Sequence, residues 1–348
     1  MGSRGRIAAT ATVGALLLGG VPAAAADEVG CGEVISSSVT LQHDLECESQ
    51  IALIVAGEGV TVDLGGNTIR YLGEAASDHD PFTHVGVLVE GVDVTTREVT
   101  VRNGRIEGYT ASVFAHLATD VRLQRLSVDR ILNLFEVRRV TVERSRLRDV
   151  HADAAHDVAL RGNQVRGSVW LSESNTPEVV RNRFRKGGVM LGGWDGRVVD
   201  NHFHRSPAAA ITFGRASGGS VAIDNRIHHA RVGIEFREFG HDDILVRGNR
   251  ITNSRSAGIL ATDTVEPAPS NVHIERNRIT RSGFGAASGE PVDGIRIDAP
   301  TALGTTLTRN HVRVSAGHAI HAPGVTDGGG NVARHARARP ACVGVVCR

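Results

Sequence analysis

The sequence has few aromatic residues, very little methionine and a single lysine. Phe, Trp and Tyr make up 4% of its 348 residues, the methionines are Met1 and Met190, and Lys186 is the only lysine. The 39 basic residues are balanced by 38 acidic ones, so no net field favours nucleic acid or an anionic membrane. No basic stripe interleaved with aromatics marks a nucleic-acid site, and one internal methionine argues against copper binding through Met.

Long apolar runs and familiar catalytic motifs are also missing after residue 26. That part of the sequence contains no candidate membrane span, Walker loop, nucleophile elbow, H-E-x-x-H motif or EF-hand loop. Residues 1–26 have the pattern of a secretion signal peptide, with Arg4 and Arg6 before an uncharged apolar stretch and an A-x-A cleavage site at Ala24–Ala26. We therefore expect a secreted, extracellular protein that starts near Asp27. A retained N-terminal anchor is the alternative.

A short phrase returns along the chain: apolar, any residue, apolar, one or two polar residues, Asn, any residue, apolar. Successive marks lie 18 to 33 residues apart, which is the period of stacked coils that contact mainly their neighbours. The sequence therefore predicts a solenoid of about ten coils. The residues at the Asn place are Asn103, Gln124, Ser145, Asn163, Asn182, Asn201, Asn225, Asn249, Asn277 and Asn310.

The apolar positions favour strands over the helices of other repeats. They are mostly Val and Ile, and a second alternating segment lies between marks, for example VGIEF at 232–236 and DGIRI at 293–297. A leucine-rich repeat would need Leu at most of these places. We predict an all-β parallel β-helix as a single domain over 27–348, with a cap at 27–48, coils over 49–332 and a tail at 333–348. The asparagines should stand at one corner, because Asn tolerates left-handed backbone angles and its amides can form a ladder.

The four cysteines lie at the two ends of the expected mature chain. Four cysteines allow three pairings. Roughly ten coils at about 4.8 Å each separate the ends by about 50 Å, which is far beyond disulfide reach. We therefore expect one disulfide between Cys31 and Cys47 and another between Cys342 and Cys347, each closing an end of the stack.

Three segments resemble secreted right-handed parallel β-helix repeat proteins of the pectate-lyase-like superfamily. They are CGEVISSSVTLQHDLEC at 31–47, VTVDLGGNTIRYLG at 60–73 and GGNVARHARARPACVGVVC at 329–347. The resemblance covers essentially all of the expected mature chain and implies a right-handed coil. It does not choose a function, because that superfamily holds polysaccharide lyases, glycoside hydrolases, uronate epimerases, copper-delivery factors and members without known activity.

If the Gly-h-x-h segments form one sheet, every second residue points outward. The inward residues are then Val87, Val89, Ile234, Phe236, Ile295 and Ile297. The outward residues are Leu88, Glu90, Phe114, His116, Asn133, Phe135, His151, Asp153, Trp170, Ser172, Met190, Thr212, Glu235, Arg237, Leu260, Thr262, Arg296, Asp298 and His321. A tryptophan among acids and bases suits sugar binding, since the ring stacks on a sugar face while hydroxyls bond to charged groups. Inserts at 73–84, 262–271 and 283–292 would wall this groove.

Removing the C5 proton of a uronate needs a base, and a cation that stabilises the adjacent carboxylate. We assign catalytic candidates to His151, Asp153, Glu235 and Arg237, and substrate contacts to Trp170, His116, Arg296 and Asp298. Hydrolysis would instead need two carboxylates, for which Asp153, Glu235 and Asp298 are available. An exposed strand face that is charged because it is solvated is the alternative.

A second polar cluster lies in the segment EAASDHDPFTH. Asp78, His79, Asp80 and His84 could bind a divalent cation such as Ca²⁺, the only cofactor that the sequence suggests, although a polar loop without a ligand is the simpler interpretation. The leading function is a protein, expected to be a monomer, that binds or modifies an extracellular polysaccharide, as a lyase or epimerase on an acidic glycan. The alternatives are a non-catalytic glycan-binding or surface-binding protein and a purely structural solenoid.

Overall fold

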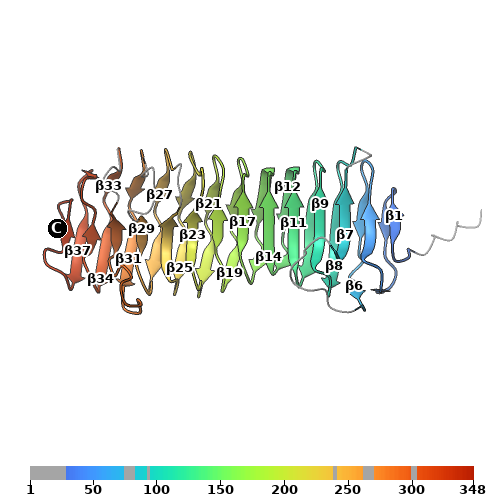
Figure 1. Cartoon of the computed structure of the whole chain (residues 1–348), viewed down its shortest axis with the longest axis horizontal. Coiled ribbons are helices and arrows are strands. Elements are labelled where there is room, and N and C mark those ends of the chain that lie inside the picture. The colour runs from blue at the N-terminus through green and yellow to red at the C-terminus, as the bar shows by residue number, and fades with distance from the viewer. Residues whose placement is uncertain (1–28, 74–82, 92–94, 238–240, 262–269, 299–303) are drawn as a thin grey trace, which may run out of the picture.

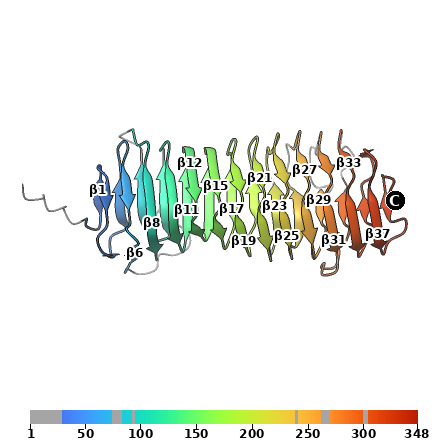
Figure 2. The same cartoon turned by 180° about the vertical axis from the view of Figure 1, so that it is seen from behind.

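The protein is a long stack of parallel strands. The computed structural model describes residues 29–73, 83–91, 95–237, 241–261, 270–298 and 304–348. This part contains 38 strands and no helix, and its first and last coils lie at opposite ends of a rod (Figure 1). Figure 2 shows the same stack from behind. The all-β solenoid predicted from the sequence is confirmed, whereas the predicted signal peptide lies outside the described residues.

Each coil contributes strands to three sheets. The first sheet contains β1 (Glu33–Ile35), β4 (Ile51–Val55), β7 (Val85–Glu90), β9 (Ala111–His116), β11 (Ile131–Phe135), β14 (Asp149–Asp153), β17 (Val169–Ser172), β20 (Val189–Leu191), β23 (Ala209–Phe213), β26 (Val232–Phe236), β29 (Ile259–Ala261), β32 (Ile295–Ile297), β35 (Ile320–His321) and β38 (Cys342–Val343). The second sheet contains β2 (Val39–Thr40), β5 (Thr61–Asp63), β8 (Thr100–Glu107), β10 (Arg122–Val128), β12 (Arg138–Glu143), β15 (His156–Arg161), β18 (Glu178–Val180), β21 (Arg197–Val199), β24 (Val221–Ile223), β27 (Leu245–Arg247), β30 (His273–Glu275), β33 (Thr306–Thr308) and β36 (Thr326–Asp327). The third sheet contains β3 (Leu45–Cys47), β6 (Thr68–Tyr71), β13 (Arg146–Leu147), β16 (Gln164–Val165), β19 (Arg183–Arg185), β22 (His202–His204), β25 (Arg226–His228), β28 (Arg250–Thr252), β31 (Arg278–Ser282), β34 (His311–Ser315) and β37 (Val332–Ala336). The second and third sheets join at β8 and β10, which pair with strands of both.

The stack is longer than the sequence predicted. The first sheet has 14 strands rather than about ten, because the earliest coils lack the Asn mark that was counted. Residues expected to form a cap and a tail also join the stack, since β1 pairs with β4 and β38 pairs with β35. Fourteen strands leave thirteen spacings, so the two ends of this sheet are about 62 Å apart. The disulfides pair Cys31 with Cys47 and Cys342 with Cys347, as predicted.

The core runs along the axis inside the three sheets. The predicted inward residues are buried, with Val87, Val89 and Ile234 at 0% exposure and Phe236 at 2%. Aromatic side chains stack between neighbouring coils, as in the pair Phe213 and Phe236, whose ring centroids are 5.1 Å apart. Each coil therefore buries its apolar residues mainly against the coils before and after it.

The corner between the second and third sheets carries the predicted ladder of asparagines. The side-chain Nδ2 of Asn201 donates to Oδ1 of Asn225 at 3.1 Å, and Asn225 donates in the same way to Asn249 at 3.0 Å. Equivalent bonds join every step of the fully buried column. Its members are Asn163, Asn182, Asn201, Asn225, Asn249, Asn277, Asn310 and Asn331.

Two details of this corner differ from the prediction. The left-handed backbone angle belongs to the residue before the ladder position, for example Asp224 with φ 54°, because the buried Asn must point its amide into the stack. Asn103 itself has φ 58°, and Gly104 stands at the ladder position of that coil. Gln124 is likewise outside the ladder, because the amide of Leu126 is the one that bonds to Ser145.

Candidate functional site

The outward residues of the first sheet form two columns, as the alternation predicted. Residues in one column are in register from strand to strand, so neighbours are about 4.8 Å apart. The first column runs through Leu88, Phe114, Asn133, His151, Trp170, Met190, Thr212, Glu235, Leu260, Arg296 and His321. The second column begins with Glu90, His116, Phe135, Asp153 and Ser172.

The second column loses its side chains in the middle of the sheet. In the next two coils Gly192 and Gly214 stand at the place of Ser172. Their backbone bonds to the preceding coil show this, since the amide of Gly192 donates to the carbonyl of Leu171 and that of Gly214 to the carbonyl of Leu191. The absent side chains leave a cleft of about 550 Å³. Its lining residues are Ser172, Glu173, Asn175, Met190, Gly192, Gly193, Trp194, Gly214, Arg215 and Ala216.

Both tryptophans of the protein are exposed at this cleft or next to it. Trp194 lines it directly and is 52% exposed, and its ring rests on Gly218, where an added Cβ would lie 2.3 Å from a ring atom. Trp170 is 49% exposed and is in register with Met190, which lines the cleft. Exposed rings beside a floor of glycine form flat apolar surfaces within an otherwise polar face. Sequence reasoning identified Trp170 but missed Trp194, which follows its strand and belongs to no alternating segment.

One flank of the cleft holds His151, Asp153 and Trp170. The His151 imidazole stacks on Trp170 with centroids 5.4 Å apart and an interplanar angle of 20°. Burial lowers the pKa of His151 below its usual 6.5, against the opposing pull of the Asp149 carboxylate. The imidazole is therefore neutral at pH 7 and able to accept a proton. Asp153 is exposed on the adjoining second column.

The other flank holds Glu235 and Arg237. Glu235 is only 8% exposed, and its carboxylate accepts from Arg231 at 3.1 Å and lies 3.7 Å from Nε of Arg237. Arg231 also bonds to Glu290 at 3.3 Å, so the expected insert at 283–292 covers this part of the sheet. The inserts at 73–84 and 262–271 are mostly outside the described residues.

The four predicted catalytic residues therefore fall into two groups. Four strand spacings separate His151 from Glu235 along the first column, which is about 19 Å. A base at His151 and a cation at Arg237 cannot serve the same sugar ring across that distance. They can contact different units of one polymer chain.

The remaining predicted contacts lie further along the same face. His116 bonds to Glu90 at 3.1 Å and lies against the rings of Phe114 and Phe135, with centroids 5.7 and 5.5 Å away. Near the other end, Arg296 donates from Nε to Asp298 at 2.6 Å and from a terminal nitrogen to the buried Asp293 at 3.3 Å. The positive charge of Arg296 is thus already compensated by the Asp293 and Asp298 carboxylates.

Most of the predicted cation cluster lies outside the residues that the structure describes. Asp78, His79 and Asp80 lie outside the described residues. His84 is described, and its ring packs on Tyr71 at 4.8 Å while its buried Nδ1 has no hydrogen-bond partner among the described residues. The Ca²⁺ prediction at this cluster stays a prediction.

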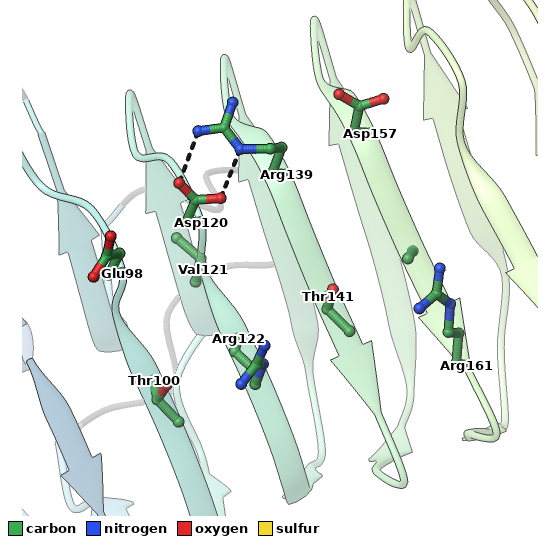
Figure 3. A pocket seen from close by; sticks show the side chains of 10 residues that line it. Glu98, Thr100, Asp120, Val121, Arg122, Arg139, Thr141, Asp157 and Arg161 are labelled. Carbon is green, nitrogen blue, oxygen red and sulfur yellow. Dashed lines mark hydrogen bonds and ion pairs between the residues drawn. The ribbon is translucent and has the colours of Figure 1, made fainter. Parts of the chain in front are cut away.

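The second sheet carries a different kind of hollow, of about 710 Å³. Figure 3 shows its charged lining, in which Arg139 makes two bonds to Asp120, at 2.6 and 2.7 Å. These bonds lower the pKa of the Asp120 carboxyl below its usual range. The hollow has no aromatic lining residue. Two of its arginines pair with carboxylates of neighbouring coils, Arg139 with Asp120 and Arg161 with Glu178. This face suits stabilisation of the stack in water better than recognition of a ligand with apolar faces.

Comparison with known proteins supports the fold directly. The family model described as "Right handed beta helix region" matches residues 150–326, just over half of the chain. Among solved structures, the periplasmic alginate epimerase AlgG is 13% identical, with a TM-score of 0.52 over 80% of this chain and 76% of that chain. The alginate lyase AlyF-OU02 is 12% identical, with a TM-score of 0.52 over 88% and 79%.

A third solved structure is not named as an enzyme. The surface protein and adhesin PfbA of Streptococcus pneumoniae is 9% identical, with a TM-score of 0.50 over 89% of this chain and 88% of that chain. At such identities the likeness is one of fold. No curated protein matches the sequence. The described part of the chain also contains no helix with the length and hydrophobicity that a membrane span requires.

Proposed function

This chain belongs to the right-handed β-helix family, and from that premise we propose that it is a secreted protein that binds an acidic polysaccharide across the first sheet. The observation that carries the proposal is the glycine-floored cleft with Trp194 in its lining and Trp170 beside it. The names of the similar structures, an alginate epimerase and an alginate lyase, support a glycan ligand. Two disulfides and the signal-like residues 1–26 support secretion.

The geometry suits a chain of sugars that runs along the axis of the stack. Trp170 and Trp194 offer their faces to pyranose rings, while the exposed Arg237 lies one strand beyond Gly214 on the second column. Arg215 lines the cleft on the same side. Guanidinium groups bind carboxylates with two parallel hydrogen bonds, which favours a uronate over a neutral sugar.

The binding proposal has a test that removes no functional group. Gly192 does not have a left-handed backbone angle, and an added Cβ there would meet its nearest atoms at 3.4 Å, an ordinary contact. Gly192→Leu should therefore fill the cleft without disturbing the coil and abolish binding to a uronate-rich polysaccharide. Binding is measured by calorimetry on the mature protein, and circular dichroism checks the fold.

Two further substitutions separate stacking from charge. Trp170→Ala should weaken binding by about 1–3 kcal/mol, the usual cost of deleting an aromatic anchor. Arg237→Ala should weaken binding to uronate-rich more than to neutral polysaccharide, and more at low salt. The matched controls are Phe284→Ala, an exposed aromatic on an insert, and Arg183→Ala, an exposed arginine on the third sheet. If the cleft variants and these controls bind alike, the polysaccharide does not use the cleft. A wild-type protein that binds no polysaccharide would be a structural solenoid.

A second candidate function is proton abstraction from a uronate, as in a lyase or an epimerase. It is favoured by the contacts of Arg296, which is in register with His321 on the adjacent strand. His321 lies 3.7 Å from Asp298, which also bonds to Arg296. The base His321 and the Arg296 guanidinium, whose charge is shared between Asp293 and Asp298, thus meet within one sugar length, unlike His151 and Arg237.

Two signals together detect proton abstraction from an oligouronate. Epimerisation in heavy water places deuterium at C5, whereas elimination leaves no proton at C5 and is detected by the ultraviolet absorbance of the 4,5-unsaturated product. His321→Gln should abolish whichever signal the wild-type protein gives while leaving binding intact, and His273→Gln on the second sheet should change neither. A wild-type protein that gives neither signal would leave glycan binding as the function and exclude this chemistry.

A further inference from the structure

Three histidines meet at the corner where the third sheet leads back to the first. His204 and His228 end β22 and β25 and are in register, and Thr252 follows them in the same column on β28. The residues after the first two, Arg205 and His229, both have φ 58°. This left-handed turn places the His229 ring against that of His228, with centroids 4.0 Å apart and planes at 72°.

The three rings are close enough to share one ion. One ring nitrogen from each lies within 4.8 Å of those from the other two. Nitrogens bound to a single tetrahedral Zn²⁺ at about 2.0 Å are about 3.3 Å apart. The rings must therefore close by about 1.5 Å at most. Side-chain rotation can supply this movement, because His204 and His228 are only partly buried and His229 is exposed.

Thr252 determines which nitrogen of His228 is available. Its hydroxyl lies 3.4 Å from the carbonyl of Ile227, to which it donates, and 2.6 Å from Nδ1 of His228. With its own proton directed at that carbonyl, the hydroxyl accepts from Nδ1–H, which leaves the lone pair on Nε2 of His228. A hydrogen bond to the far nitrogen is the usual support of a metal-bound imidazole.

Burial lowers the pKa of both His204 and His228 below 6.5, and the charges of Arg205 and Arg185 lower that of His204 further. At neutral pH a metal ion therefore displaces few protons from these two imidazoles. The same arginines repel a dication, so the affinity should rise with ionic strength rather than fall.

We propose that His204, His228 and His229 form a binding site for one borderline divalent cation of the Zn²⁺ type. Three imidazole nitrogens without a carboxylate suit Zn²⁺, Cu²⁺ or Ni²⁺, whereas Ca²⁺ and Mg²⁺ require oxygen ligands. Because His229 is exposed, a water or an external ligand would be able to reach an ion held by these three imidazoles. The site joins two successive coils, and the five residues of β23 separate its corner from the opposite edge of the first sheet, where the cleft lies.

The test is Zn²⁺ titration of the untagged mature protein by competition with a chromophoric chelator at pH 7.5. The wild type should bind one Zn²⁺. Single substitutions His204→Gln, His228→Gln and His229→Gln should each weaken binding at least 10-fold, and the triple variant should not bind at this site. Thr252→Val should weaken binding about 10-fold through the lost support of Nδ1. The affinity should fall as the pH is lowered, because protons compete with the metal ion for the imidazole nitrogens.

The matched control is His335→Gln, because His335 is also exposed and also has a left-handed φ, of 57°. It should bind Zn²⁺ as the wild type does. Thermal unfolding without metal shows whether each variant is folded, and Ca²⁺ should fail to compete. Equal stoichiometry and affinity in the wild type and the folded triple variant would overturn the proposal, as would a wild type that binds no Zn²⁺.

Discussion

Replacing one asparagine of the ladder should destabilise the stack far more than replacing an asparagine elsewhere. Asn225 is fully buried, and its side chain makes four hydrogen bonds. Nδ2 donates to the carbonyl of Val198 at 2.8 Å and to Asn249 at 3.0 Å, while Oδ1 accepts from the backbone amide and the side chain of Asn201 at 2.9 and 3.1 Å.

The magnitude follows from which groups Asn225→Ala would leave without these bonds. Nδ2 of Asn201 keeps its bonds to two carbonyls, and Oδ1 of Asn249 keeps the backbone amide of residue 225. The buried amide of Asn201 and the carbonyl of Val198 lose theirs. An unsatisfied buried group costs about 1–3 kcal/mol, so Asn225→Ala should lower the free energy of unfolding by about 2–6 kcal/mol.

Urea unfolding gives the free energy, and hydrogen exchange shows whether the loss is local, as expected when coils contact mainly their neighbours. The amide of Asn201 should exchange faster than in the wild type. The control is Asn253→Gly, at a partly buried corner with φ 56°, which glycine adopts freely, so it should cost less than about 1 kcal/mol. Equal effects of the two substitutions would refute the ladder as a source of stability.

Three other predictions concern single positions. Burial lowers the pKa of His241 to about 4, so between pH 6.5 and 4 only the unfolded chain takes up the proton. The contribution of His241 to the free energy of unfolding is complete above pH 6.5 and should fall by about 3 kcal/mol as the pH drops to 4. This pH dependence should vanish in His241→Gln, as urea titrations at several pH values would reveal. Because His241 bonds to the carbonyl of Arg237 at 2.8 Å, the same substitution should also loosen Arg237 and weaken uronate binding in calorimetry at pH 7. Gly258→Ala should lower the melting temperature by several degrees, since its Cβ would lie 2.5 Å from the carbonyl oxygen of Gly294. Gly285→Ala should be close to neutral, because its Cβ would lie 3.3 Å from its nearest neighbour, the Cγ of Arg255.

Period and alternation were sufficient to predict the repeating parts of the structure. The register of Asn163 through Asn310 and the outward column through Trp170 and Arg296 follow from spacing alone, because every coil must bury the same face. The number of coils could not be predicted in this way, since the corners of the first coils carry Gly or other residues in place of the ladder asparagine. The left-handed position was misplaced by one residue, because a buried ladder side chain and a strained turn need adjacent residues.

The cleft could not be predicted by the same reasoning. It arises from side chains that are missing at Gly192 and Gly214, and such a gap shows only when coils are aligned in space. Trp194 lies in the turn after its strand, where alternation assigns no direction. The separation of His151 from Arg237 likewise depends on how many coils intervene, which a list of outward residues does not convey.

Hydrogen exchange of the wild-type protein with and without an oligouronate tests the central proposal most directly. Binding across the cleft predicts slower exchange in the segments 173–175, 192–194 and 214–216, which surround the Gly192 floor, and unchanged exchange in β18 and β19 on the other sheets. Protection confined to the second or third sheet would contradict binding across the cleft. So would the absence of any protection at an oligouronate concentration that saturates the wild-type protein.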